Sequence, residues 1–384
     1  MKKEFLRKTC LPILMGLLVL ACFIVAGCSQ EKTKKPEVIK IGILAPLSGD
    51  AASWGEAAKE GYDLAVEQVN MAGGISGRSL EPIYEDTQAQ PEKAASAMLK
   101  LATVDKVPAV LGSITSAATL AAAPIAEKNH VVLLSPTSSA PKLSKAGKYI
   151  FRIWPSDTAE GSAIADFAAS KMNLKHVDIL YIQNDYGLAL KDVFQRVFTN
   201  KGGIVPVTLA YKQDETDFRP YLSRIAADKP DAVYLVSYYK DAAMVFKQAR
   251  ELGLDLQFLG TTALEDPKLI ELAGTAAEGV IYAIPAGFDP KGKDPTVTAF
   301  VMAFKKKFGK EPGIVAAHTY DAMNIIASVM KKGAMDGPAI QQALENLKGY
   351  HGVTGVISFD ENGDVVKDIH IKTIKDGRFV DYTK

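Results

Sequence analysis

The sequence predicts an α/β protein of two lobes, each built on a mostly parallel sheet flanked by helices. Two observations predict this class. From Val38 onward, short β-rich runs alternate with helical segments, as in right-handed βαβ crossovers. The alternation restarts at Phe151, and a chain of 384 residues is long enough to form two domains with sizeable cores.

The first series of elements contains four strands and three helices. Its strands are predicted at 38–46, 79–87, 108–113 and 130–136, and its helices at 53–74, 91–105 and 115–129. Gly73 and Gly74 end the first helix, because glycine readily adopts the left-handed conformation of a helix C-terminus. Pro91 suits the first turn of the second helix, where no amide hydrogen bond is lost.

A second series follows, and then a block of helices. The strands of the second series are predicted at 151–154, 176–185, 203–212, 231–239, 256–262 and 279–286, and its helices at 157–172, 186–203, 218–228 and 241–253. Consecutive helices at 295–309, 315–332 and 338–349 are expected to return to the first lobe. The segment 351–380 is predicted as β-hairpin material with turns at Asn362-Gly363 and Asp376-Gly377. The expected lobes are 38–156 with 286–352, and 157–285 with 353–384.

The N-terminal 27 residues are expected to lie outside the fold. A basic start is followed by the apolar run Leu11 to Ala26, which is shorter than the ~20 residues of a spanning helix. The run ends in Val25-Ala26-Gly27-Cys28, which fits a secretory signal and resembles a bacterial lipoprotein box. That resemblance implies export, cleavage before Cys28 and lipid attachment to it. Residues 28–37 are polar and charged and are interpreted as a tether.

Composition and motifs exclude several classes of function. The chain has 45 Lys and Arg against 44 Asp and Glu, and this balance argues against a nucleic-acid partner. All three cysteines occur at or before position 28, so the folded body has no disulfide. The sequence has no Walker A, GxGxxG, HExxH or CxxC motif, and Ser116 has no evident base to make it a nucleophile. We therefore expect no enzyme activity, no cofactor and no metal.

The strand ends indicate where a ligand would bind. In open α/β sheets, ligands sit beyond the carboxyl ends of the strands. The residues at those ends are mostly hydroxyl-bearing and aromatic, at 47–49 with Trp54, 113–116, 135–139, 184–187, 237–239 and 261–262. The stretch GSITSAAT (112–119) also starts a helix, whose free amides and dipole attract anions. This pattern predicts a polar recognition site with aromatic walls.

Several stretches in this order resemble a known family. They are 39–86, 110–143, DYGLAL (185–190), 233–253 and GVTGVISFDENGD (352–364). Together they resemble the type I periplasmic binding proteins of ABC importers, in particular the branched-chain amino-acid-binding group. The resemblance implies a two-lobed clamshell that closes on a small-molecule ligand. It also implies a monomer that meets a permease and an ATPase and touches the membrane only through its lipid.

The resemblance also implies ligand contacts. Hydroxyls of Ser116 and Ser139, with backbone groups near Ile114 and Thr137, match the family's carboxylate-binding positions. The aromatic contacts that match are Trp54 from the first lobe and Tyr186 and Tyr238 from the second. Tyr239 is expected to face the core or solvent, because it follows Tyr238 directly on a predicted strand.

The sequence departs from the family at one position. Thr262 stands where the family places an acidic partner for the ligand's ammonium, and Glu265 follows three residues later. Either Glu265 reaches the site, Asp185 or another carboxylate substitutes, or the ligand has no ammonium. The expected ligand is a branched-chain or other apolar amino acid. Alternatives are an aromatic or aliphatic carboxylate, an amide or a urea, or a sensor role without transport.

Overall fold

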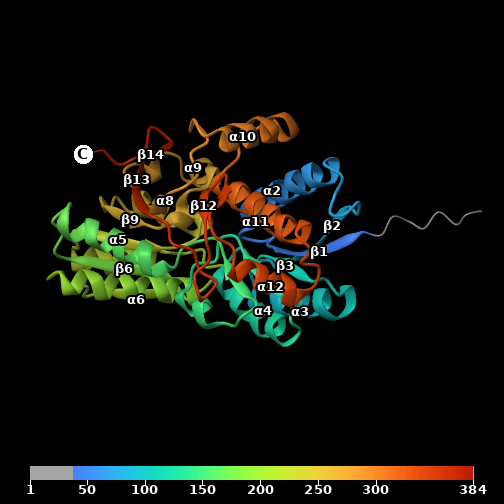
Figure 1. Ribbon diagram of the computed structural model, residues 1–384. Helices are drawn as coiled ribbons and strands as arrows, with labels where there is room; N and C mark the ends of the chain where they lie inside the picture. The colour runs from blue at the N-terminus through green and yellow to red at the C-terminus, as the bar shows by residue number, and fades with distance from the viewer. Residues whose placement is uncertain (1–37, 384) are drawn as a thin grey trace, which may run out of the picture. The chain divides into compact units, whose positions relative to one another are not determined.

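The computed structural model describes residues 38–383, and the predicted signal, the tether and Cys28 lie outside them. The predicted α/β class is confirmed, with two main sheets flanked by helices (Figure 1). The first sheet is parallel, in the order β2-β1-β3-β4-β5. Its strands are β1 (Ile39–Ala45), β2 (Leu80–Asp86), β3 (Ala109–Leu111), β4 (Val132–Ser135) and β5 (Ile150–Arg152).

Helices cover both faces of the first sheet (Figure 1). They are α2 (Ala52–Met71), α3 (Pro91–Lys100), α4 (Ser116–Lys128), α10 (Pro295–Phe308), α11 (Ile314–Lys331) and α12 (Gly337–Glu345). Side chains alternate between the faces of a strand. Ile41 and Ile43 of β1 therefore belong to the core cluster that includes residues of α2 and α11, and Leu44 packs with the α3 and α4 side. The last three helices, α10 to α12, pack against elements of this sheet, since α10 and α11 pack on α2 and α12 packs on β4.

The second sheet has the order β14-β13-β10-β9-β8-β6-β7. Its parallel strands are β6 (Val177–Ile182), β7 (Thr208–Tyr211), β8 (Ala232–Val236), β9 (Phe258–Gly260) and β10 (Ile281–Pro285). Antiparallel β13 (Ile369–Lys375) and β14 (Arg378–Asp381) extend it. Its helices are α5 (Asp157–Ser170), α6 (Asp185–Asn200), α7 (Arg219–Asp228), α8 (Tyr239–Glu251) and α9 (Pro267–Ala273). A buried aromatic stack, with Phe194 4.2 Å from Tyr234 between ring centroids, ties α6 to β8.

The C-terminal segment differs in part from the prediction. The hairpin with a turn at Asp376-Gly377 is confirmed between β13 and β14. The turn at Asn362-Gly363 joins no paired strands, so the hairpin predicted there is wrong. Asp360 Oδ1 instead accepts the amides of Asn362 and Asp364 and folds the segment into a compact loop. The pairing occurs earlier, between β11 (Tyr350–Gly352) and β12 (Gly355–Ile357).

The connection between β12 and β13 packs first against one lobe and then joins the other. Phe359 lies 5.3 Å from Phe151 between ring centroids, and Asp364 pairs with Arg152 at the end of β5. From Ile369 onward the chain belongs to the second sheet. We therefore propose that the second lobe's C-terminal part begins between Asp364 and Ile369 rather than at 353.

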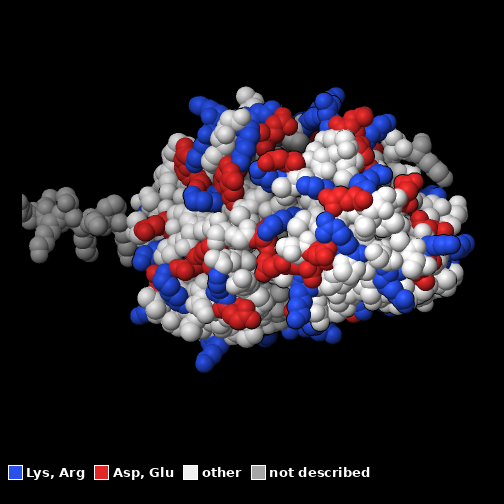
Figure 2. Space-filling model, turned by 180° about the vertical axis from the view of Figure 1, so that it is seen from behind, with Lys and Arg blue, Asp and Glu red and all other residues white. Residues whose placement is uncertain are grey.

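The surface carries mixed charge. On the face shown in Figure 2, basic and acidic side chains are interspersed, as the balanced composition of the chain would produce. Within residues 38–383, every helix is either too short or too polar to cross a bilayer.

Candidate functional site

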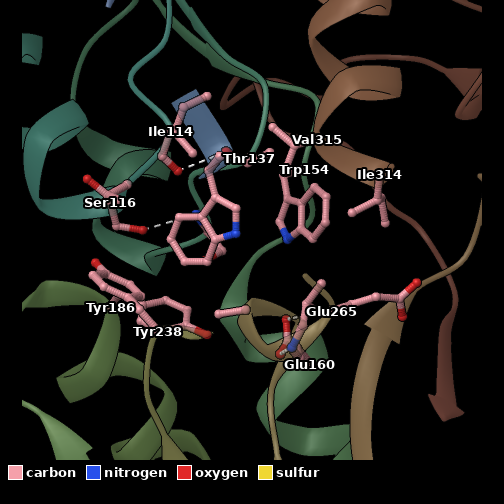
Figure 3. A pocket seen from close by; sticks show the side chains of 15 residues that line it. Ile114, Ser116, Thr137, Trp154, Glu160, Tyr186, Tyr238, Glu265, Ile314 and Val315 are labelled. Atoms are coloured by element: carbon pink, nitrogen blue, oxygen red, sulfur yellow. Dashed lines mark hydrogen bonds between the residues drawn. The ribbon is translucent and has the colours of Figure 1, made fainter. Parts of the chain in front are cut away.

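A pocket lies where the carboxyl ends of the parallel strands of the two sheets meet (Figure 3). It encloses about 70 Å³ of space that the centre of a water molecule can reach. About 10–15 Å³ of such space holds one water molecule, so the pocket has room for one small solute. Its lining consists of Trp54, Ile114, Thr115, Ser116, Thr137, Ser139, Trp154, Glu160, Tyr186, Tyr238, Thr262, Ala263, Glu265, Ile314 and Val315.

Ser116, the first residue of α4, presents an oriented hydroxyl to this pocket. Its Oγ accepts hydrogen bonds from the amides of Ser139 and Ala140, both at 3.1 Å. A hydroxyl oxygen has two lone pairs and one hydrogen. Since both lone pairs are occupied, the Ser116 O–H is left as a donor for a group in the pocket.

The loops around Ser116 add further donors. Thr115 lines the pocket, and its buried Oγ1 has no hydrogen-bond partner within residues 38–383. Thr137 Oγ1 is already engaged, because it donates to the carbonyl of Ile114 at 2.8 Å. The first amides of α4 are free of helical partners and lie at the positive end of its dipole. This wall of the pocket is therefore suited to a carboxylate without any arginine or lysine.

A buried arginine holds the Ser139 loop from behind. Arg152 is 1% exposed, and its Nη1 donates to the carbonyls of Ser139 and Ala140 at 2.7 and 3.0 Å. Its Nε and Nη2 form a two-pronged ion pair with Asp364 at 2.7 and 2.8 Å. The two carbonyls thus point toward Arg152, while the two amides point toward Ser116.

Aromatic rings from both lobes meet beside the pocket. The Trp54 ring lies edge-on to Tyr238 and Tyr239, with centroid distances of 5.1 and 5.3 Å. Tyr186 stacks on Tyr238 at 5.8 Å. Tyr239 is buried in the core and does not line the pocket, as expected, and its hydroxyl also accepts the Ser53 amide of the first lobe at 3.3 Å. It contacts the first lobe because it begins α8 rather than ending a strand.

The remaining wall is largely apolar. Ile314 and Val315 come from the start of α11, and Trp154 follows β5 (Figure 3). Trp154 is held against the buried His318 of α11, with ring centroids 4.6 Å apart. This wall offers contact to an apolar part of a ligand.

Thr262 binds a carboxylate from another element. Its amide donates to Glu160 Oε1 at 2.8 Å and its hydroxyl to Glu160 Oε2 at 3.0 Å. Glu160 lies in the first turn of α5 and is 2% exposed. The position expected to carry an acidic residue therefore has one beside it, supplied by α5.

The two carboxylates proposed from sequence as substitutes are already paired. Glu265 accepts Lys372 Nζ at 2.8 and 2.9 Å and the Tyr282 hydroxyl at 2.5 Å. In Figure 3 its carboxylate points away from Ser116. Asp185 accepts Lys142 Nζ of the other lobe at 2.7 Å and does not line the pocket.

Burial perturbs the carboxyl groups of α5. Burial raises the pKa of Glu160 to about 8, and the charge of Asp157 adds to the rise. Burial also raises the pKa of Asp157 to about 7, although the Ser139 side chain and the Arg152 guanidinium oppose this rise. At neutral pH, Glu160 in the pocket lining therefore favours its protonated form, and Asp157 in the same turn of α5 is about half protonated.

The structure brings all nine residues predicted from sequence into this lining, and it adds others. The additions are Thr115, Trp154, Glu160, Ala263, Ile314 and Val315. Trp154 ends the predicted strand FRIW and Glu160 follows it, and the strand-end rule would have found them had it been applied there. Ile314 and Val315 arrive from a helix far along the chain and have no local signal.

Three side chains elsewhere could in principle hold a metal ion. His176, Asp178 and Asp228 place one ligand atom each within 4.8 Å of one another. His176 Nε2 is hydrogen-bonded to Asp228 at 2.6 Å, which accounts for the arrangement without an ion. The cluster sits at the amino end of β6, at the opposite end of the strand from the pocket.

Comparison with known proteins identifies the family. A family model described as periplasmic binding protein matches residues 38–378. The chain belongs to the periplasmic binding protein family. This binding protein is 29% identical over 331 residues to the leucine-, isoleucine-, valine-, threonine- and alanine-binding protein of Pseudomonas aeruginosa, covering 86% of the chain and 87% of that relative.

Two solved structures extend the comparison. LivJ of Streptococcus pneumoniae, in complex with isoleucine, is 30% identical with a TM-score of 0.82, covering 89% of this binding protein and 98% of LivJ. A solute-binding protein of Rhodopseudomonas palustris, in complex with 3,4-dihydroxybenzoic acid, is 28% identical with a TM-score of 0.80. The match covers 90% of this binding protein and 95% of the Rhodopseudomonas protein. The type I clamshell and the branched-chain amino acid ABC transporter family are thereby confirmed. The homologues are substrate-binding proteins rather than enzymes, and the family is exported.

Proposed function

We propose that this protein captures a small carboxylate-bearing solute, a branched-chain or other apolar amino acid, and delivers it to the permease of an ABC importer. The observation that carries the proposal is the Ser116 hydroxyl. Two backbone amides occupy its lone pairs and leave its hydrogen for a ligand carboxylate. The start of α4 and the hydroxyl of Thr115 supply further donors on the same wall.

The apolar side chains of the pocket lining support a ligand with an apolar body. Trp54, Ile114, Trp154, Ile314 and Val315 contribute apolar surface to the lining. The isoleucine bound by LivJ and the 3,4-dihydroxybenzoic acid bound by the Rhodopseudomonas protein both combine a carboxyl group with an apolar body. The two tryptophans favour an aromatic carboxylate as the second candidate ligand.

Contacts between the lobes suggest how the ligand would be enclosed. Ser53 of α2 bonds to Asp266, which begins α9, at 3.1 Å, and Lys142 pairs with Asp185 across the lobes at 2.7 Å. A ligand shifts the population toward a closed form only if it contacts both lobes. Trp54 and Ser116 on one lobe, with Tyr238 on the other, give a bound solute such contacts.

A panel of solutes tests the proposed function. Ligand-free protein would be heated with L-leucine, L-isoleucine, 3,4-dihydroxybenzoate, propionamide or urea. A ligand at about 100 times its dissociation constant should add ~2.7 kcal/mol to the free energy of unfolding, which is visible as a rise in melting temperature. Stabilisation by an aliphatic amino acid is expected. Stabilisation only by the amide or urea would overturn the proposal.

Replacement of Ser116 by alanine is expected to weaken ligand binding by about 1–3 kcal/mol, because a carboxylate oxygen loses its hydroxyl donor inside the protein. Calorimetric titration with L-leucine measures the change. Ser96→Ala is the matched control, since Ser96 is exposed on α3 and bonds only its own helix at Glu92. Equal affinities of the Ser116 variant and the wild type would contradict this placement of the carboxylate.

We also propose that the protein is lipid-anchored through Cys28, which the small residues before it support. Cys28→Ala is expected to move the protein from the membrane fraction to the soluble fraction of cells. Fractionation and metabolic labelling with palmitate measure this. Incorporation of label by the Cys28 variant at the wild-type level would refute the assignment.

A further inference from the structure

Glu160 is a buried carboxyl group that lines the pocket and forms no ion pair with a cationic side chain within residues 38–383. Its hydrogen bonds come from a backbone amide and a hydroxyl, both of Thr262. Within residues 38–383, the charged group that shifts the pKa of Glu160 is Asp157, another carboxyl group. Each Glu160 oxygen accepts one hydrogen bond and retains capacity for a second.

The neighbouring basic side chains are committed elsewhere. Arg152 forms its ion pair with Asp364, and Lys372 forms its ion pair with Glu265. An ionised carboxylate in such a place costs several kcal/mol unless a cation is brought to it. Within residues 38–383, neither of these basic side chains is therefore available to neutralise an ionised Glu160, and a cationic group of the ligand could do so.

The position of Glu160 complements that of Ser116. In Figure 3, Ser116 projects from the first lobe and Glu160 lies across the pocket from it. One wall offers hydrogen-bond donors to an anion, and the other offers a carboxyl group to a cation. A zwitterionic solute matches both walls, whereas a simple carboxylic acid matches one.

We propose that Glu160 binds the amino group of the ligand, and that the protein therefore selects an amino acid over the same acid without its amine. Thr262 acts as a positioning residue, because its amide and hydroxyl orient the carboxylate. The inference rests on the proposed function, since it assumes that the ligand's carboxylate lies at Ser116.

The test compares L-leucine with 4-methylpentanoate, which is leucine without its amine. Wild-type protein should bind leucine about 100-fold more tightly than 4-methylpentanoate. Glu160→Gln should remove most of this preference because it weakens the binding of leucine. Glutamine keeps the shape of the side chain and an acceptor for Thr262. Glu271→Gln, an exposed carboxylate paired with Lys268, is the control and should keep the full preference.

The outcomes separate the inference from the proposed function. If 4-methylpentanoate binds the wild type as tightly as leucine does, or if Glu265→Gln abolishes the preference and Glu160→Gln does not, the inference is wrong. If the inference fails but Ser116→Ala weakens the binding of both solutes, the proposed function is still supported. If neither solute binds the wild type, the proposed function fails with it.

A second readout needs no variant. Binding of an ammonium should drive Glu160 into its ionised form, so leucine should release about one proton per molecule bound at pH 7. Titration in two buffers of different ionisation enthalpy measures this, and 4-methylpentanoate should release no proton.

The other titratable groups facing Glu160 are Asp157 on its own helix, Tyr186 of α6 and Tyr234 of β8. Both tyrosines stay neutral because burial raises their pKa well above the ordinary value. Absence of proton release with tight leucine binding would overturn the inference.

Discussion

Replacement of Arg152 by methionine is expected to lower the free energy of unfolding by about 3–5 kcal/mol, because it removes one partner of a buried ion pair. The change would remove the Arg152 donors from the Asp364 carboxylate and from the carbonyls of Ser139 and Ala140. Since Arg152 is 1% exposed and the Asp364 side chain is 15% exposed, water can replace those bonds only in part. Urea denaturation of the ligand-free protein measures the loss.

A surface arginine provides the control. Arg219 pairs with Asp217 and Glu251, but its side chain is 49% exposed, so Arg219→Met should cost no more than ~1 kcal/mol. The double variant Arg152→Met with Asp364→Leu should regain part of the lost stability, because no charge is left unpaired. If the free energy of unfolding of Arg152→Met lies within ~1 kcal/mol of the wild-type value, the Arg152–Asp364 ion pair does not stabilise the Ser139 loop.

The fold was predictable because its signals are local and repeated. Runs such as IKIGILA give the buried pattern of a parallel strand, and most of them are followed by a helix of 3.6-residue periodicity. The turn at Asp376-Gly377 carries its own conformational preference. The Asn362-Gly363 sequence has the same preference for a tight turn. There, however, the contacts of Asp364 with Arg152 and Ser144 determine the structure of the loop. Tertiary contacts of that kind leave no trace in a local pattern.

The site was predictable to the extent that strand ends define it. Ser116, Thr137 and Tyr238 follow strands, and the topology brings those ends together. Glu160 is different, because its role depends on Thr262, about one hundred residues away on another element. The resemblance to the family implies an acidic residue at the position of Thr262, which the sequence lacks. Only the packing of α5 against that loop shows which carboxyl group lies beside it.

The largest pH effect is expected from Glu160. Its pKa is raised in the fold from 4.5 to about 8. Between these values the folded protein holds a proton that the unfolded chain has released, so stability falls as pH rises. The loss is about 1.4 kcal/mol for each pH unit of that window. Glu160→Gln has no such proton, and the ligand-free variant should therefore become more stable relative to the wild type from pH 5 to pH 8.

The comparison isolates Glu160 from the other buried acids. Burial also raises the pKa of Asp178 to about 6 and of Asp241 to about 7, but both remain in the two proteins and cancel in the difference. Asp157 reinforces the effect, since removal of the Glu160 charge lowers the cost of ionising it. Chemical denaturation at each pH measures the difference directly. If the two proteins lose stability in parallel from pH 5 to pH 8, Glu160 is ionised in the ligand-free fold. The pocket would then hold a fixed negative charge before any ligand arrives.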